Sequence, residues 1–404
     1  MFERLEGVNR RRFLASMGQG ALAAGLFGQT SVQTVRAQPV TPPSAAPASP
    51  PKADSAPLSG SPSTLLPPEQ RVGFALVGLG KLAIGELLPA FGECKKARLT
   101  ALVSGSPDKA KTLAAQYGVP ESHLYNYQTY DRLADNPDVQ VIYIVLPNGM
   151  HAEYTIRGAQ AGKHILCEKP MATSVQECEA MIAACRQANR QLMVAYRIQY
   201  EPHHRWVRER VRNQAYGPVK LIESVNAQRL EDPHQWRLNK ALAGGGALPD
   251  IGLYCLNTTR FLLGEEPSEV SAMSYSTPND PRFRDVEEAV LFQMRFPSGA
   301  LSTNATSYDV HESRRYRVQA PSGWIEIDPA YSYTGLRLKV AQAEGKTEQV
   351  TEVEQEAKNQ FALEMDHMAE CTMNNPRPFT PGEEGLQAQS IMAAIYESAR
   401  TGKP

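Results

Sequence analysis

The feature that most constrains the fold of this chain is a glycine-rich turn that directly follows a buried strand. Residues 72–77 are apolar except for Gly73, which is typical of a strand covered on both faces. The strand leads into the run Gly78-Leu79-Gly80-Lys81-Leu82-Ala83, and a helix is expected over 83–94. A strand, a glycine turn and a helix in this order indicate the first unit of a parallel α/β sheet.

The turn has the Gly-x-Gly-x-x-Ala spacing of a dinucleotide site. Gly78 permits the tight turn, Gly80 lets the backbone approach a pyrophosphate, and Ala83 is small enough for close helix packing. The helix N-terminus supplies amide donors and a positive dipole for the phosphates. Glycine turns occur in many loops, but the flanking strand and helix supply the context that the motif requires. We therefore expect residues 78–82 to bind a dinucleotide.

Strands and helices then alternate as far as residue 196. The pattern predicts strands over 99–104, 139–146, 164–167 and 191–196, and helices over 107–117, 151–161 and 174–189. Such alternation indicates a doubly wound parallel sheet, so we expect an N-terminal Rossmann domain over residues 71–200. Ligands of these sheets lie beyond the carboxyl ends of the strands.

The end of the second strand indicates which dinucleotide binds. NAD enzymes usually place an acidic residue there to bind the ribose hydroxyls, whereas this chain has Ser104-Gly105-Ser106. Together with Lys109, one turn into the next helix, these hydroxyls favour the 2′-phosphate of NADP. The alternative is that Asp108 reaches the ribose and that Lys109 is an exposed surface lysine.

Three polar segments follow the later strands and should meet at one crevice. They are Leu146-Pro147-Asn148 with His151, Glu168-Lys169-Pro170, and Tyr196-Arg197. Adjacent opposite charges such as Glu168 and Lys169 usually form an ordinary exposed pair. Lys169 stands out because it lies directly after a buried strand and before a proline that restricts the turn.

The second half predicts a different architecture. Strands are expected over 219–225, 269–275, 289–296, 300–307, 315–319 and 324–327, with tight hairpins at 297–299 and 321–323. We expect an α+β domain over residues 201–404 with an open, mainly antiparallel sheet and C-terminal helices that return to the first domain. Such a sheet needs its second face covered, and a second subunit is a reasonable candidate, so we expect a homo-oligomer, a dimer or a tetramer.

The densest polar segment lies between the halves. Trp236 and Arg237 precede three glycines, and Pro249 suits the first turn of a helix. Asp250 and Tyr254 then share one face of that helix at a spacing of four. An acid near a helix start and a buried tyrosine are also common in purely structural roles.

Composition excludes several classes of function. The 42 basic and 43 acidic residues nearly balance, and no basic stripe alternates with aromatic residues, so a nucleic-acid partner is not expected. The six cysteines form no Cys-x-x-Cys pair and no cluster with histidine, so no metal site is expected. Because a protein that folds before export meets a reducing cytoplasm, we expect free thiols.

The N-terminus predicts export. Arg10-Arg11-Arg12-Phe13-Leu14, a weakly apolar stretch over 15–27 and a small-residue site ending at Ala37 indicate a twin-arginine signal peptide over 1–37, and hence the export machinery as a partner and the periplasm as destination. A disordered basic terminus is the alternative. Residues 38–70, rich in Pro, Ala and Ser, form a linker or an arm across a neighbouring subunit. Since soluble nicotinamide stays in the cytoplasm, an exported enzyme should keep NADP tightly bound.

Together these motifs resemble the glucose-fructose oxidoreductase and inositol dehydrogenase (Gfo/Idh/MocA) family from about residue 72 to the C-terminus. The residues that carry the resemblance are the Gly78 fingerprint, residues 146–148 with His151, residues 168–170, and Asp250 four before Tyr254. Most relatives have histidine where this chain has Tyr254. Tyrosine there, with residues 236–238, 243–246, 263–267 and 381–385, is similar to the glucose-fructose oxidoreductase subgroup, which is exported and retains NADP.

The resemblance implies a mechanism and a set of site residues. Tyr254 would take the proton of an aldose, with Lys169 favouring the phenolate and Asp250 binding sugar hydroxyls or orienting the pair. Arg197 and Tyr196 would line the sugar site. The residues implied at the cofactor are Gly78, Leu79, Gly80, Lys81, Leu82, Ser104, Gly105, Ser106, Lys109, Leu146, Pro147, Asn148, His151, Glu168, Lys169, Arg197, Trp236 and Arg237.

The implied reaction is a ping-pong oxidation of glucose to its lactone, coupled to reduction of fructose to sorbitol. Residues 226–234, which should border the sugar pocket, differ from the pattern of sorbitol-producing enzymes. Three alternatives therefore stay open: an aldose-aldose oxidoreductase, an NADP-dependent sugar dehydrogenase with exchangeable cofactor, and a sugar-binding or regulatory protein with a vestigial nucleotide site.

Overall fold

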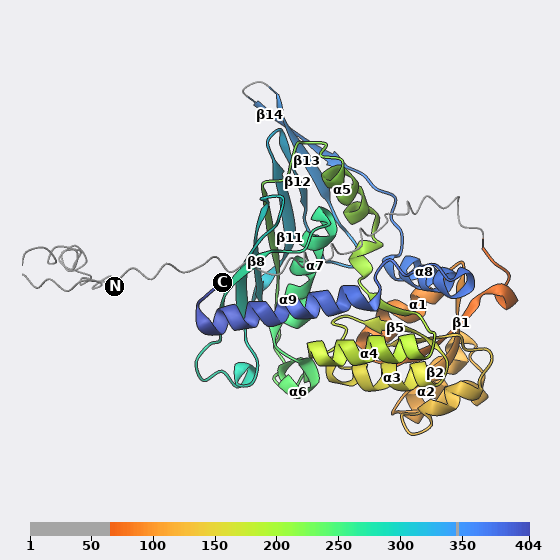
Figure 1. Ribbon diagram of the computed structural model, residues 1–404. Helices are drawn as coiled ribbons and strands as arrows, with labels where there is room; N and C mark the ends of the chain where they lie inside the picture. Colours follow the sequence, from red (N-terminus) through yellow and green to blue (C-terminus); the bar gives the residue numbers. More distant parts are fainter. Residues whose placement is uncertain (1–64, 345–346) are drawn as a thin grey trace, which may run out of the picture. The chain divides into compact units, whose positions relative to one another are not determined.

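A computed structural model describes residues 65–344 and 347–404 (Figure 1). The expected signal peptide, 1–37, and all but the last six residues of the expected arm, 38–70, lie outside the described residues. Within the described ranges, no helix combines the length and the apolar character that a bilayer crossing requires.

The first sheet has six parallel strands in the order β3-β2-β1-β4-β5-β6, which confirms the predicted Rossmann architecture. The strand order reverses between β1 and β4, and in such sheets ligands bind at this point, beyond the carboxyl ends of the strands. The strands are β1 (Val72–Val77), β2 (Ala97–Val103), β3 (Leu124–Tyr125), β4 (Val141–Ile144), β5 (His164–Glu168) and β6 (Leu192–Ala195).

Helices cover both faces of this sheet. One face packs against α1 (Leu88–Phe91), α2 (Pro107–Tyr117) and the C-terminal helix α8 (Gln360–Asn374), and the other against α3 (His151–Gln160) and α4 (Val175–Gln187). Strands β1, β4 and β6 are buried along their length, as predicted for a sheet covered on both sides. Short 3-10 or π segments complete this half: η1 (Pro68–Gln70), η2 (Ala83–Leu87), η3 (Glu121–His123), η4 (Tyr130–Asp135), η5 (Asn148–Met150) and η6 (Arg197–Gln199).

The second sheet has eight strands in the order β14-β13-β12-β11-β7-β10-β9-β8. Every neighbouring pair is antiparallel except β7 and β10, which confirms the prediction of a mainly antiparallel sheet. The strands are β7 (Leu221–Arg229), β8 (Glu269–Tyr275), β9 (Ala289–Arg295), β10 (Leu301–Ser307), β11 (Asp309–Ala320), β12 (Gly323–Ile327), β13 (Leu338–Glu344) and β14 (Thr347–Val353).

One face of the second sheet is packed and the other carries exposed apolar side chains. In β9, Val290, Phe292 and Met294 are buried while the alternate residues, including Leu291, are exposed. The helical segments of this half are α5 (Pro202–Arg212), η7 (Trp236–Leu238), α6 (Lys240–Ala243), η8 (Leu248–Gly252), α7 (Leu253–Leu263), η9 (Pro281–Phe283) and α9 (Gly382–Thr401). On the exposed face, Met273 pairs with Leu291 across β8 and β9.

The C-terminal helices tie the two sheets together. Helix α8 packs against β1 and β2, while α9 contacts β6 and α4 of the first sheet and β8 of the second. This placement brings α8 residues next to the strand ends where the polar segments meet.

Candidate active site

The glycine turn has the geometry of a dinucleotide cradle. Gly78 has φ +95°, and a Cβ there would lie 2.3 Å from the carbonyl oxygen of Val145, so no other residue fits without strain. A Cβ on Gly80 would meet nothing within 4 Å, which leaves open space above the turn. The Leu79 side chain is buried, so only its backbone can face a ligand. This cradle fits the pyrophosphate of NAD(P).

The residues predicted to bind the 2′-phosphate lie beside that cradle. The exposed Lys109 places its Nζ 3.4 Å from the carbonyl oxygen of Leu79. Ser104 Oγ accepts a hydrogen bond from the backbone N–H of Ser106 at 3.1 Å. A Cβ on Gly105 would lie 3.0 Å from the ring of Tyr127, which borders the same loop. The structure therefore brings an ammonium group and two serines to the end of β2.

His151 and Asn148 brace the loop after β4. The ring of His151 is fully buried, with Nδ1 2.9 Å from the Pro170 carbonyl oxygen and Nε2 2.8 Å from that of Leu146. Burial lowers the pKa of His151. Asn148 donates from Nδ2 to the carbonyl oxygen of Ala243 at 2.8 Å. His151 therefore connects two strand-end loops and leaves neither ring nitrogen free for a ligand.

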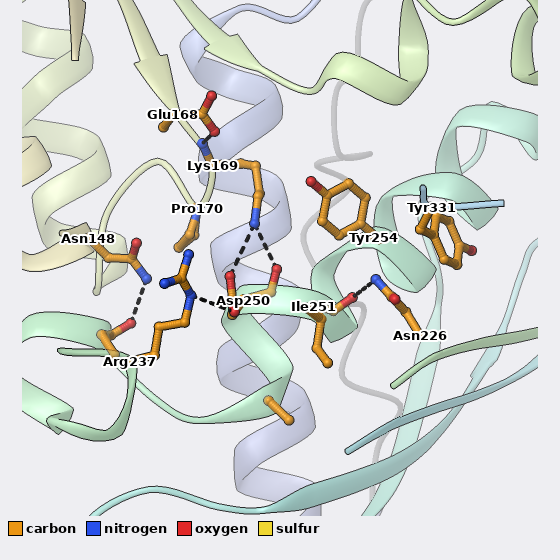
Figure 2. Close-up of polar contacts among 12 residues, drawn as sticks. Asn148, Glu168, Lys169, Pro170, Asn226, Arg237, Asp250, Ile251, Tyr254 and Tyr331 are labelled. Carbon is orange, nitrogen blue, oxygen red and sulfur yellow. Dashed lines mark hydrogen bonds and ion pairs between the residues drawn. The ribbon is translucent and has the colours of Figure 1, made fainter. Parts of the chain in front are cut away.

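Lys169 and Asp250 form the centre of the site. The Lys169 ammonium donates to the backbone carbonyl oxygen of Asp250 at 2.8 Å and to its Oδ1 at 3.4 Å. Both side chains are nearly buried, at 13% and 14% exposure. Figure 2 shows the ammonium directed at Asp250, with Tyr254 beside it. Lys169 Nζ also lies 4.8 Å from the centre of the Tyr254 ring.

The other oxygen of Asp250 is held equally firmly. Oδ2 accepts hydrogen bonds from Arg237 Nε at 2.9 Å and from the Tyr308 hydroxyl at 2.8 Å. Burial would raise the pKa of this carboxyl, but Arg237 and Lys169 outweigh burial and hold it at about 2. Asp250 is therefore a carboxylate that orients two cations, rather than a free group waiting for sugar hydroxyls.

The hydroxyl of Tyr254 is held by Arg197. Arg197 Nε donates to the Tyr254 hydroxyl oxygen at 3.1 Å, and its guanidinium lies 4.8 Å from the centre of the same ring. The remaining hydrogen bonds of Arg197 go to neutral acceptors: the carbonyl oxygens of Tyr331 and Ser332 and the side chain of Gln360. Among the described residues no carboxylate lies within ion-pair distance of this buried guanidinium, although its charge also acts on Glu86, Glu168 and Glu364.

A π-helical turn presents these groups. Asp250 lies in η8, which continues into α7, where Tyr254 stands. A Cβ on Gly246 would lie 1.9 Å from the carbonyl oxygen of Glu287, so glycine is required there. The Glu287 carboxylate accepts the backbone N–H groups of Gly246 and Leu248, at 2.8 Å and 3.0 Å, and thereby caps the segment. In π geometry a spacing of four does not align two residues as it does in an α-helix. Lys169 nevertheless contacts both, through the Asp250 carboxylate and the Tyr254 ring.

Three of the predicted site residues need correction: the His151 ring, already bonded at both nitrogens, Tyr196 and Glu168. Tyr196 is only 3% exposed and packs in the hydrophobic core, so it does not line a sugar site; its neighbours Cys167 and Cys178 are core residues of β5 and α4. The Glu168 carboxylate faces the protein interior, accepting the Tyr143 hydroxyl at 2.8 Å and the Lys169 N–H at 3.2 Å. Both side chains follow buried strands, and a strand end alone does not tell which way a side chain points.

Sequence reasoning missed four residues that the fold brings to the site. Tyr308 follows β10 and contacts Asp250, while Gln360 of α8 accepts from Arg197. Tyr143 of β4 and Glu364 of α8 contact each other beneath Lys169. The only signal for Tyr308 was its position directly after an expected strand, and nothing in the local pattern marked the two α8 residues.

Trp236 and Arg237 lie in η7, and the Arg237 guanidinium stacks 4.6 Å from the centre of the Trp236 ring. The described residues contain no group of three or more His, Cys, Asp or Glu side chains arranged to hold a metal ion. All six cysteines are buried and unpaired. At the centre of the site Asp250 forms ion pairs with two cations, Lys169 and Arg237.

A Rossmann sheet with a dinucleotide cradle, and a Lys-Asp-Tyr cluster at its strand ends, defines an NAD(P)-dependent oxidoreductase. Comparison with known proteins agrees. The model for the oxidoreductase family with an NAD-binding Rossmann fold, GFO_IDH_MocA, matches residues 72–196, and the GFO/IDH/MocA C-terminal domain matches residues 204–326. The chain belongs to the Gfo/Idh/MocA family and is a sugar oxidoreductase.

Several relatives span nearly the whole described chain. The crystal structure of aldose-aldose oxidoreductase from Caulobacter crescentus, complexed with glycerol, is 46% identical with a TM-score of 0.80, covering 82% of this chain and 98% of that one. D-xylose 1-dehydrogenase [NADP(+)] of Haloarcula marismortui is 32% identical over 335 residues, 82% of this chain and 91% of its own. A levoglucosan dehydrogenase structure, 23% identical with a TM-score of 0.72 over 82% and 98% of the two chains, shares the fold.

Proposed function

We propose that this protein is an aldose-aldose oxidoreductase that retains NADP and works by a ping-pong mechanism. The observation that carries the proposal is the Tyr254 hydroxyl, which accepts a hydrogen bond from Arg197 beside the Lys169–Asp250 pair. The 46% identity to aldose-aldose oxidoreductase favours an aldose as the second sugar over fructose. The glucose-fructose pairing implied by the sequence is therefore the less supported version of the same chemistry.

Tyr254 acts as the base in the first half-reaction. It accepts the proton of the anomeric hydroxyl as the hydrogen on C1 leaves with its electron pair. A bound nicotinamide supplies the hydride acceptor in this half-reaction and the hydride donor in the next. To accept this proton Tyr254 starts as the phenolate, and the guanidinium of Arg197 at its oxygen and the ammonium of Lys169 over its ring both stabilise that negative charge.

The same groups serve the second half-reaction, in which the proton transfer is reversed. Tyr254 returns its proton to the carbonyl oxygen of the acceptor sugar, so it ends each cycle as the phenolate with which it began. Asp250 keeps Lys169 and Arg237 in place throughout, since its low pKa leaves it ionised at neutral pH. The pair of half-reactions needs no other base.

Retention of the cofactor is part of the proposal. The predicted twin-arginine signal over 1–37 would take the folded protein to the periplasm, where a lost NADP could not be replaced. The arm over 38–70 and a homo-oligomer formed through the exposed face of the second sheet belong to the same proposal. Met273, Leu291 and Leu301, at 71%, 53% and 42% exposure on β8, β9 and β10, supply an apolar surface for it.

The test needs no added nucleotide. Purified protein should carry bound NADP through dialysis, and an aldose alone should produce one stoichiometric rise in the absorbance of reduced nicotinamide. A second aldose should reverse the rise and yield its alditol, faster than fructose yields sorbitol. Protein that is isolated empty, and turns over only with free NADP, would refute cofactor retention.

A second candidate is a sugar dehydrogenase with exchangeable NADP. The D-xylose 1-dehydrogenase [NADP(+)] of Haloarcula marismortui, at 32% identity, favours it. The two candidates differ in one measurement, which is whether the rate with aldose depends on the concentration of added NADP. A rate that saturates with added NADP supports the dehydrogenase.

A further inference from the structure

One buried hydroxyl lies between two buried carboxyl groups beneath the site. The hydroxyl of Tyr143, on β4, is 2.8 Å from Oε1 of Glu168 and 3.3 Å from Oε1 of Glu364 on α8. Tyr143 and Glu364 are fully buried, and Glu168 is 8% exposed. Glu168 is the residue directly before Lys169, and Figure 2 shows it adjoining that lysine.

The hydroxyl has one proton and cannot satisfy two carboxylates. The shorter contact identifies Glu168 as the acceptor from Tyr143. The longer contact then joins two oxygens without a proton between them unless Glu364 carries one itself. A protonated Glu364 would donate to the Tyr143 oxygen and complete a chain from Glu364 through Tyr143 to Glu168.

The surroundings of the two carboxyls also favour a proton on Glu364 rather than on Glu168. Glu364 Oε2 is buried with no hydrogen-bond partner in the described part of the chain, which is costly for an anion and less so for a neutral acid. Glu168 has the ammonium of Lys169 nearby and accepts the Lys169 N–H. The charge of Arg197 lowers the pKa of both carboxyls. The phenol of Tyr200 adjoins Glu364, and the thiol of Cys167 adjoins Glu168.

The electrostatic balance agrees with the geometry. Burial, followed by the charge of Glu168, raises the pKa of Glu364 well above its ordinary value. Burial also raises the pKa of Glu168, but Lys169, Tyr143 and Arg197 oppose that effect. The proton of the pair therefore belongs on Glu364.

We propose that Glu364 is a neutral carboxylic acid that shares one buried proton with Glu168 through the hydroxyl of Tyr143, and so positions the Glu168–Lys169 segment. Glu364 touches neither sugar nor nicotinamide and is a positioning residue. Resting on the proposed function, a second consequence follows: because Glu364 is uncharged, the Arg197 guanidinium faces no anion from α8 and remains available to the Tyr254 oxygen.

Infrared spectroscopy of the full-length protein tests the location of the proton without any sugar. At neutral pH the wild type should show the C=O absorption of a buried carboxylic acid that shifts on exchange into D2O. This absorption should vanish in Glu364→Gln and persist in Glu168→Gln. Its absence from the wild type would overturn the proposal, and so would its loss in Glu168→Gln with persistence in Glu364→Gln.

Turnover gives the matching functional test. An amide can donate as a neutral acid does, so Glu364→Gln should retain activity within about threefold of the wild type, whereas Glu364→Ala, which leaves Tyr143 without its donor, should lose about tenfold or more. Glu168→Gln should also lose about tenfold, because a charged acceptor is replaced. Equal losses in Glu364→Gln and Glu364→Ala would show that the acid must be ionised. Failure of the aldose reaction itself would leave the infrared result unaffected.

Discussion

Arg197 donates its Nε hydrogen bond to the hydroxyl of Tyr254, 57 residues away in the chain, at 3.1 Å. Lys169, which the family resemblance suggested as the activating cation, lies over the face of the tyrosine ring and gives its own hydrogen bonds to Asp250. The two cations therefore have different partners: Arg197 bonds the Tyr254 hydroxyl and Lys169 bonds Asp250. Lys169 forms an ion pair with Asp250, while in the described part of the chain the other hydrogen bonds of Arg197 go to neutral acceptors.

Replacing Arg197 should slow the reaction more than it weakens sugar binding. Arg197→Met removes a charge-assisted hydrogen bond worth ~1.5–3 kcal/mol, so kcat should fall by about 10- to 100-fold. Steady-state kinetics with varied sugar concentration measure kcat and KM. The control is Arg186→Met on α4, whose side chain is 78% exposed; an unchanged kcat in Arg197→Met would contradict the assignment.

Asp250→Asn should destabilise the protein in a pH-dependent way. At neutral pH it leaves Lys169 and Arg237 without their shared anion, and we expect a loss of about 3 kcal/mol in the free energy of unfolding. The pKa of Asp250 is depressed from 3.8 to about 2, so its stabilisation is complete above pH 3.8 and is lost as pH falls towards 2.

The difference in the free energy of unfolding between wild type and Asp250→Asn should therefore narrow by roughly 2 kcal/mol at low pH, at about 1.4 kcal/mol per pKa unit. Urea unfolding at pH 7, 5, 4, 3 and 2 measures it. A gap that stays constant across this range would show that the carboxylate is not stabilised by its two cations.

Glu364→Gln should become relatively more stable as pH rises. The folded-state pKa of Glu364 is raised, so above its ordinary value of 4.5 the folded protein binds a proton that the unfolded chain releases. Wild-type stability therefore falls as pH increases towards the folded-state pKa, and the variant escapes this loss. Melting temperatures at pH 5, 6, 7 and 8 should show a growing difference in favour of the variant. The exposed Glu121→Gln should show none.

Reversing the charge of Lys109 should reduce selectivity for NADP. Its ammonium lies beside the glycine turn, 3.4 Å from the Leu79 carbonyl oxygen, where a 2′-phosphate would meet it. Lys109→Glu should lower affinity for NADP by about tenfold or more and affect NAD little, since only NADP carries the extra charge. The matched control is Lys111→Glu, exposed on the same helix. Equal effects of the two variants on NADP affinity would show that Lys109 does not bind the 2′-phosphate.

A charge on the exposed face of the second sheet should change the oligomeric state. Leu291 and Met273 are cross-strand partners at 53% and 71% exposure. Leu291→Asp would place an unpaired carboxylate in the proposed subunit interface and should shift the protein towards monomer in sedimentation velocity. Met373→Asp on α8, at 40% exposure, is the control. Unchanged sedimentation in Leu291→Asp would place the interface elsewhere or exclude it.

Local patterns predicted much of the fold because they depend on near neighbours. The strand over 72–77 and the helix over 107–117 have the predicted bounds, since the buried run and the proline that starts the helix are read within one element. The strands β13 and β14 were not predicted, because their polar, charged sequences lack a clear alternation. Likewise the helix after the glycine turn opens with a π segment that residue spacing does not reveal.

The sequence by itself determined the class of fold, the dinucleotide turn and the residue types at the strand ends. These follow from glycine conformation and apolar periodicity, which act over a few residues. Only the tertiary structure decided which cation meets Tyr254 and which way Tyr196 and Glu168 point. Those contacts join segments far apart in the chain, such as Tyr143 and Glu364, 221 residues apart. Their partners are set by how β4, β5 and α8 pack against each other, a relationship that no local pattern contains.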